Sequence, residues 1–147
     1  MKPKLPASKL RKKIDKGWHR ANKAGKERKH LIKVCDSLVA QIVKARDGGC
    51  VICPTGNPRS PIRECGHLFS RRYMSLRFDL MNTHEQCQYH NSLHRFDTHP
   101  YNSWFVSKFG AKAWDELYKK KSETKSWKTY ELEELKAELT AKLEASI

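Results

Sequence analysis

Two short pairs of metal-ligand residues constrain this chain more than any other feature of its sequence. The pairs are Cys50-x-x-Cys53 and Cys87-x-x-His90. Thiolate and imidazole groups suit tetrahedral Zn²⁺, and a spacing of two residues lets each pair close locally around the ion. The sequence therefore predicts a structural Zn²⁺ bound by Cys50, Cys53, Cys87 and His90.

The segment around these pairs favours a metal because it has little else to hold it together. Prolines and glycines divide residues 50–95 into short pieces, and a small loop-rich unit needs a covalent or metal link to stay folded. Cys65 lies in the same segment and is an alternative to His90 as the fourth ligand. If Cys65 closed the site, His90 would be free for catalysis or for contact with a partner.

Basic side chains are concentrated at the N-terminal end of the chain. The formal net charge is +14, and residues 1–47 hold 15 basic and 4 acidic side chains. Such a concentration indicates a polyanionic partner, and we expect nucleic acid, with Lys12 and Lys13 among its contacts. A membrane is not expected, because no apolar run approaches the ~20 residues of a spanning helix. A merely solvated basic helix is the alternative interpretation.

The first residues and the cysteine content predict a reducing compartment. Residues 1–6 lack the apolar stretch of a secretory signal, so we expect a cytoplasmic protein. Disulfides are rare there, which favours metal binding by the five cysteines. Cys35 is the exception, because it lies on an apolar helical stripe and is expected to be a buried structural thiol.

Helical periodicity predicts a mainly helical α+β fold in three parts. Residues 1–47 form a basic helical arm of one or two helices, with Gly25 as a candidate interruption and Asp47-Gly48-Gly49 as the end. Residues 48–121 form the zinc-bound core with its following helices, and Gly110 is expected to end one of them. Residues 122–147 form a linker and an amphipathic helix, which packs on the core or on a second copy. The apolar stripe of that last helix consists of Leu132, Leu135, Leu139 and Leu143.

Polar residues around the two metal pairs follow the order found in HNH nucleases, whose fold is called ββα-metal. His67 comes first, Asn82 follows fifteen residues later, and Asn91 directly follows the last zinc ligand. The stretch from Cys50 to Tyr118, with Gly-His-Leu-Phe-Ser-Arg-Arg-Tyr at 66–73 and Gln-Cys-x-x-x-Asn at 86–91, resembles the NinG/Rap family of lambdoid-phage recombination endonucleases. Segments 104–110, 113–117 and 132–135 resemble that family as well.

The resemblance implies a nuclease that hydrolyses phosphodiester bonds in DNA, and each residue has a chemical role in that reaction. His67, at the end of a short β-hairpin, would activate water as the base, since its ordinary pKa of about 6.5 leaves it largely neutral. Asn82 would orient His67 by hydrogen bonding from the intervening loop. Asn91, at the start of the next helix, would ligate Mg²⁺ or Mn²⁺ through its amide oxygen.

One position departs from the usual HNH pattern. Many HNH nucleases place an aspartate directly before the base, where this chain has Gly66. The NinG kind is similar to this chain in carrying an acid three positions before the histidine, so Glu64 is expected to be a second ligand of the catalytic cation. An ion pair with Arg63 or Arg71 is the alternative for Glu64. His94, one helical turn after His90 and Asn91, is a reserve ligand.

Three arginines and the symmetry of the expected substrate complete the prediction. Arg71, Arg72 and Arg77 are expected to contact DNA phosphates through their guanidinium groups.

The resemblance implies cutting of Holliday junctions, D-loops or other branched DNA, for which a homodimer would supply two active sites. The competing prediction is a non-catalytic zinc-containing nucleic-acid-binding protein. The remaining histidines are expected at the surface: His19, His30, His84 and His99.

Overall fold

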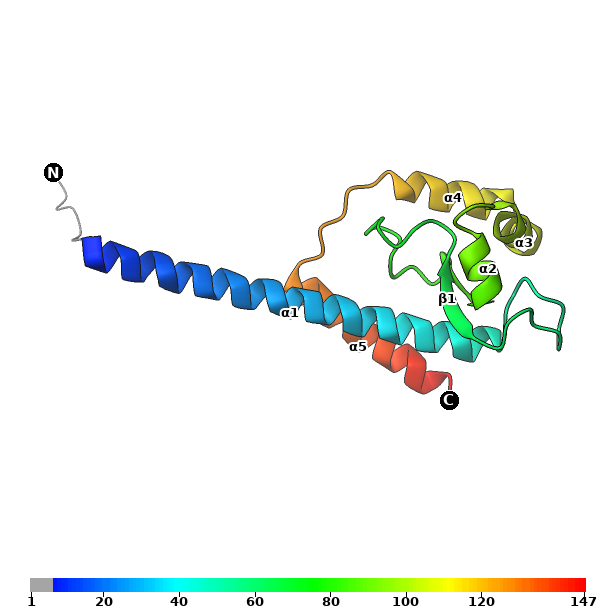
Figure 1. The fold of residues 1–147 in the computed structure, drawn as a ribbon, viewed down its shortest axis with the longest axis horizontal. Coiled ribbons are helices and arrows are strands. Elements are labelled where there is room, and N and C mark those ends of the chain that lie inside the picture. Colours follow the sequence, from blue (N-terminus) through cyan, green and yellow to red (C-terminus); the bar gives the residue numbers. More distant parts are fainter. Residues whose placement is uncertain (1–6) are drawn as a thin grey trace.

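A computed structural model describes residues 7–147 and shows a mainly helical α+β architecture (Figure 1). The segment 1–6, on which the expectation of a missing secretory signal depends, lies outside the described residues. Within the described range the elements, in chain order, are α1 (Ala7–Asp47), β1 (Arg63–His67), β2 (Thr83–Cys87), α2 (Gln88–Leu93), α3 (His99–Phe109), α4 (Ala111–Lys121) and α5 (Thr129–Ala145).

The basic arm is one long helix, α1, which continues through Gly25. The predicted interruption at Gly25 is therefore wrong, since a single helical glycine costs only about 1 kcal/mol relative to alanine and good helix formers flank it. The predicted end is confirmed: α1 stops at Asp47, and Gly48 adopts φ +68°, which glycine reaches without strain. The N-terminal half of α1 projects away from the rest of the molecule (Figure 1).

The C-terminal half of α1 forms a hydrophobic core with α5, which lies alongside it (Figure 1). Cys35 is fully buried in this core, which confirms the prediction of a structural thiol, and its Sγ donates to the Leu132 carbonyl at 3.7 Å. The leucine stripe of α5 thus packs within the chain, but mainly on α1, the predicted arm, where packing on the zinc-bound core was expected. The buried members of this core are Leu31, Cys35, Val39, Ile42, Val43, Phe78, Leu132 and Leu139.

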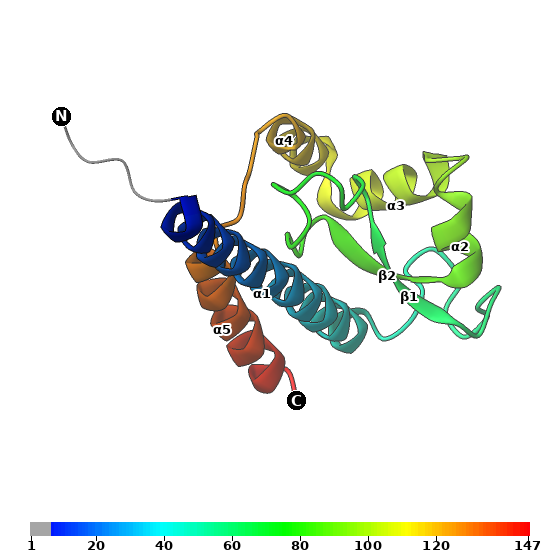
Figure 2. The ribbon, with the colours of Figure 1, turned by 60° about the vertical axis from the view of Figure 1, so that its left-hand side comes forward.

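Strands β1 and β2 form an antiparallel hairpin that lies between α1 and α2 (Figure 2). Its register pairs Arg63 with Cys87 at one end and His67 with Thr83 at the other. Every residue of β2 is buried, because α1 and the helices α2 and α3 cover the strand from both sides. The hairpin therefore fixes the C-terminal end of β1, where His67 lies, relative to the start of α2.

A second core forms where α3 and α4 pack on the loop after β1. Tyr101 and Phe105 of α3 and Leu117 of α4 are buried together with Leu68 and Leu76 of the loop. Gly110 ends α3 as predicted, with φ +91°, and α4 begins at the next residue.

The structure also corrects the placement of one histidine. His84, predicted at the surface, lies in β2 with 1 % of its surface exposed. The Tyr101 hydroxyl donates to the Gly66 carbonyl at 3.1 Å and therefore accepts a hydrogen bond from His84 Nδ1 at 2.9 Å. The Nε2 atom of His84 has no hydrogen-bond partner among the described residues and lies near aromatic rings.

Burial of His84 predicts a loss of stability in mild acid. Burial lowers the pKa of His84 from 6.5 to about 4 in the folded chain, so only the unfolded chain binds this proton between those values. The contribution of His84 to the free energy of unfolding is therefore fully present above pH 6.5. It is lost as the pH falls toward 4, and the total loss is about 3 kcal/mol. Denaturant titrations at several pH values, on the parent and on His84→Leu, measure this contribution. Equal losses of stability in both proteins across this range would contradict it, since both retain the same metal ligands.

Candidate metal centre and adjoining groove

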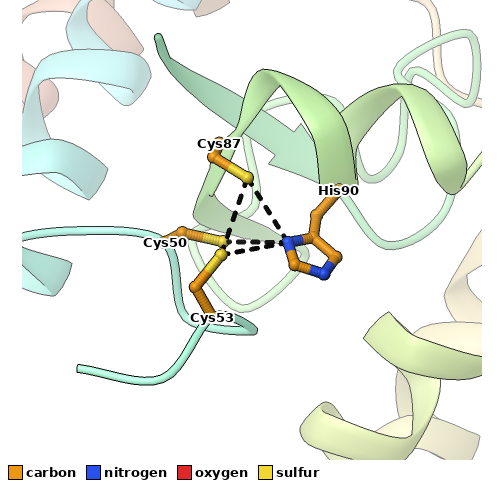
Figure 3. A group of neighbouring side chains, drawn as sticks. All are labelled: Cys50, Cys53, Cys87 and His90. Carbon is orange, nitrogen blue, oxygen red and sulfur yellow. Dashed lines mark hydrogen bonds between the residues drawn. The ribbon is translucent and has the colours of Figure 1, made fainter. Parts of the chain in front are cut away.

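The two predicted metal pairs meet in one cluster (Figure 3). The ligand atoms of Cys50, Cys53, Cys87 and His90 all lie within 4.8 Å of one another. His90 faces the sulfur atoms with Nδ1, at 3.6 Å from Cys50, 3.2 Å from Cys53 and 3.3 Å from Cys87. The Cys53 and Cys87 sulfurs are 3.7 Å apart.

These separations are the ones that a tetrahedral zinc ion imposes on its ligands. With Zn–S bonds of about 2.3 Å and a Zn–N bond of about 2.0 Å, tetrahedral geometry places two sulfurs about 3.8 Å apart and a sulfur and a nitrogen about 3.5 Å apart. Three thiolates and one imidazole are also the ligand chemistry that zinc prefers. The cluster could therefore hold a structural metal ion such as zinc.

The local backbone explains how each ligand reaches the cluster. Cys87 is the last residue of β2 and His90 lies in the first turn of α2, so the strand-to-helix transition presents both side chains. Cys50 and Cys53 lie in the loop after α1, which is tied to β2 by a bond from the Val51 N–H to the Glu85 carbonyl at 2.9 Å. The Arg59 N–H donates to Cys53 Sγ at 3.3 Å.

Cys65, the alternative fourth ligand, lies outside the cluster. It is in β1 and packs against the core between α1 and α5. Burial raises the pKa of this thiol to about 11. His90 therefore completes the group, as favoured from the spacing.

A groove of about 740 Å³ is lined in part by Asn91 of α2, the residue that follows the cluster residue His90. It gathers His67 from the end of β1, Asn91 and His94 from α2 and its C-terminal end, and Arg71 and Arg72 from the loop after β1. The remaining lining residues were not predicted as site residues, although four of them belong to the 66–73 motif and Cys65 was considered only as a zinc ligand. They are Cys65, Leu68, Phe69, Ser70, Tyr73, Arg95 and Thr98.

His67 is held in one tautomer by the loop that follows it. Its Nε2 lies 3.0 Å from the Arg77 carbonyl, which can only accept, so Nε2 carries the proton and Nδ1 keeps a lone pair. Burial lowers the pKa of His67 below 6.5, and the imidazole is therefore neutral at neutral pH. A neutral imidazole with a free ring nitrogen is able to take up a proton.

Glu64 and Asn91 are brought together across the hairpin and α2. The Asn91 amide Nδ2 donates to Glu64 Oε2 at 2.6 Å. Arg63, one of the alternative partners for Glu64, instead forms a bidentate ion pair with the buried Glu85, including a 2.9 Å contact. Glu64 is therefore paired with Asn91, a residue that lines the groove.

Gly66 explains why no acidic residue precedes His67. A Cβ atom at this position would lie 2.4 Å from the side-chain nitrogen of Gln86 and 3.2 Å from Asn91 Oδ1. The packing of β1 on β2 and α2 thus leaves no room for a side chain at Gly66. An aspartate there would collide with the side chain of Gln86 and crowd Asn91.

His94 lies one turn beyond His90 and presents an unused lone pair. Its Nε2 donates to the Leu68 carbonyl at 2.9 Å, so that Nδ1 is the unprotonated nitrogen. This Nδ1 is buried and has no hydrogen-bond partner within the described residues. A buried acceptor without a partner is costly, and a ligand at this position would satisfy it.

Asn82, a predicted site residue, has a different role in the structure. Asn82 is buried, and its amide bonds to the Phe69 N–H and carbonyl, both at 2.9 Å, and to the Leu76 carbonyl at 3.2 Å. Among the described residues it makes no hydrogen bond to His67, so the expected direct orientation of His67 by Asn82 is not observed. Asn82 instead fixes the shape of the loop that supplies the Arg77 carbonyl.

Arg77 is engaged in an ion pair and not displayed for a phosphate. Its guanidinium bonds both carboxylate oxygens of Asp36 on α1, at 2.9 Å and 2.7 Å. The side chains of Arg71 and Arg72 are exposed at the groove, and those of Lys12 and Lys13 are exposed on the projecting half of α1. Arg77 is therefore a link between α1 and the loop, whereas the other four remain available to a partner.

The fold and the cluster define a class: an α+β protein with a Cys₃His site able to hold a metal, next to a groove lined by histidine and arginine. The sequence matches the family described as bacteriophage lambda NinG protein over residues 3–146, and the chain belongs to that family. No curated protein and no solved structure gives a significant match. Along the described part of the chain, none of the helices has the length and hydrophobicity needed to cross a membrane.

The composition of the cluster predicts that replacement of Cys87, but not of Cys65, removes the metal. Structural zinc contributes roughly 10–16 kcal/mol of binding free energy in small zinc-dependent domains, so its loss should unfold the segment around residues 50–95. We expect Cys87→Ser to lose the metal and melt at a much lower temperature. Cys65→Ser should keep one metal ion and most of its stability. Metal analysis with circular dichroism melts, with and without a strong chelator, checks both variants. A parent whose melt is indifferent to the chelator would contradict the metal centre.

Proposed function

We propose that this protein is a metal-dependent DNA endonuclease of the HNH type, with His67 as the general base. The observation that carries the proposal is the single groove shared by His67, Asn91, His94, Arg71 and Arg72. Phosphodiester hydrolysis needs a base for water, a cation for the developing negative charge, and groups that hold the phosphate. The groove offers a candidate for each.

The tautomer of His67 supports its role as the base. The Arg77 carbonyl holds the proton on Nε2, and burial favours the neutral ring, so Nδ1 can accept a proton from water. Asn82 acts indirectly, as a positioning residue that shapes the loop carrying the Arg77 carbonyl. Loss of Asn82 would therefore act through the orientation of His67.

Side chains in and beside the groove fit a hard cation such as Mg²⁺ or Mn²⁺. Asn91 supplies an amide oxygen, Glu64 supplies a carboxylate bonded to Asn91, and His94 has a buried Nδ1 without a partner. Oxygen ligands with one imidazole suit these metals. When bound, such a cation would stabilise negative charge on the phosphate and on the leaving oxygen.

Charge would bring the DNA backbone to this groove. Arg71 and Arg72 are exposed at its edge, where their planar guanidinium groups can bind phosphate oxygens in pairs. Lys12 and Lys13 belong to the exposed basic half of α1, which would add contacts that do not depend on sequence.

We extend the proposal to branched DNA as substrate and to a homodimer as the active form. The resemblance of the sequence to lambdoid-phage recombination endonucleases motivates the branched substrate, and symmetric cutting of a junction needs two active sites. Leu132 and Leu139 are buried against α1, so a dimer would use another surface. Sedimentation that finds only monomer, with and without junction DNA, would contradict the dimer.

Replacement of the base gives the direct test of catalysis. Parent and His67→Ala are incubated with a labelled Holliday junction and a linear duplex of matching sequence, in Mg²⁺ or Mn²⁺. Removal of a general base should slow cleavage by about 10²- to 10⁴-fold while zinc content and DNA binding are retained. His30→Ala, the same substitution at an exposed histidine of α1, is the matched control and should cut like the parent.

The outcomes separate the two candidate functions. Cleavage that needs His67 and the added cation supports the endonuclease, and the ratio of junction to duplex cutting reports its selectivity. If parent and variant bind DNA equally and neither cuts it, a non-catalytic zinc-containing nucleic-acid-binding protein becomes the better interpretation.

A further inference from the structure

An aromatic patch borders the groove, formed by Phe69, Tyr73, Trp114 and Tyr118. Trp114 and Tyr118, four residues apart on α4, stack with ring centroids 5.3 Å apart and planes only 11° from parallel. Phe69 contacts both rings, at 5.4 Å and 6.1 Å between centroids. Tyr118 remains 48 % exposed, which a ring placed only to fill a core would not be.

Cationic side chains lie directly over this patch. The Lys121 ammonium is 4.7 Å from the ring centre of Tyr118, 5.3 Å from that of Tyr73 and 5.5 Å from that of Phe69. Arg72 lies over the Tyr73 ring at 5.1 Å and donates to its hydroxyl at 3.2 Å. The only carboxylates on α4 are Asp115 and Glu116, and Glu116 lines a different depression, with Asp79 and Lys120. The patch therefore combines π faces with positive charge.

The patch is continuous with the candidate site. Phe69, Tyr73 and Arg72 line the same groove as His67, so a strand bound there would pass from the proposed reacting centre onto these rings. Aromatic faces beside lysine and arginine are the combination that binds single strands, in which bases stack on the rings and phosphates pair with the cations. Bases inside a duplex already stack on one another and cannot use such a surface.

We propose that the aromatic patch binds unpaired bases of single-stranded DNA next to the groove, with Tyr118 as the exposed stacking residue and Lys121 as the phosphate contact. This inference deepens the proposed function, because a branch point offers unpaired or easily unpaired bases beside a duplex. The lysine ammonium would move from the rings to a backbone phosphate, and its flexible stem allows this. Recognition of this kind is tolerant of sequence.

The test measures binding and does not require cleavage. A labelled oligothymidine strand and a hairpin duplex are titrated with protein, without added Mg²⁺ or Mn²⁺, and fluorescence anisotropy is followed. Tyr118→Ala should weaken binding of the single strand roughly tenfold or more and change duplex binding less than about twofold. Tyr118→Phe keeps the π face and should bind like the parent. Tyr130→Ala, at an exposed tyrosine of α5, is the control for loss of a surface ring.

The results distinguish this inference from the proposed nuclease activity. Equal binding of the single strand by Tyr118→Ala and by the parent, with unchanged melting temperature, would overturn the stacking role even if the parent cuts DNA. Loss of binding to strand and duplex alike would also overturn it, because it would point to a general defect. Selective loss in a protein that cuts nothing would support the stacking surface and contradict the nuclease.

Discussion

The Cys₃His cluster is the constraint on which the rest of the site depends. It joins three segments: the loop after α1, the end of β2 and the first turn of α2. Asn91 and the α2 C-cap His94 follow His90 closely in the chain, so the same cluster constrains where they enter the groove that also contains His67. A short helix of six residues without a buried side chain would not hold that orientation alone.

The groove beside the cluster is shaped by residues that do no chemistry themselves. Gly66 lets Gln86 and Asn91 approach β1, where any side chain would collide with them. Asn82 fixes the loop that carries the Arg77 carbonyl, and that carbonyl sets the tautomer of His67. The ion pair of Arg77 with Asp36 ties this loop to α1. The contacts that hold His67 thus extend from the groove to the long helix.

Local patterns predicted the metal ligands, the end of α1 and the helices around Gly110, because spacing and glycine conformation depend on near neighbours. The roles of Asn82, Arg77 and His84 depend on contacts between distant segments, which no local pattern reveals. A buried histidine bonded to Tyr101 has the same sequence signature as a surface one. The aromatic patch could not be predicted from the sequence for the same reason, since Phe69 and Tyr118 meet only when α4 packs on the loop after β1.

X-ray absorption spectroscopy of the purified protein at the zinc edge tests the central claim most directly. The Cys50, Cys53, Cys87 and His90 cluster predicts one zinc ion with three sulfur ligands at about 2.3 Å and one nitrogen ligand at about 2.0 Å. Four sulfur ligands would place Cys65 in the site and free His90, and a protein without zinc would remove the constraint that fixes α2. Either result would contradict the arrangement of the groove described above.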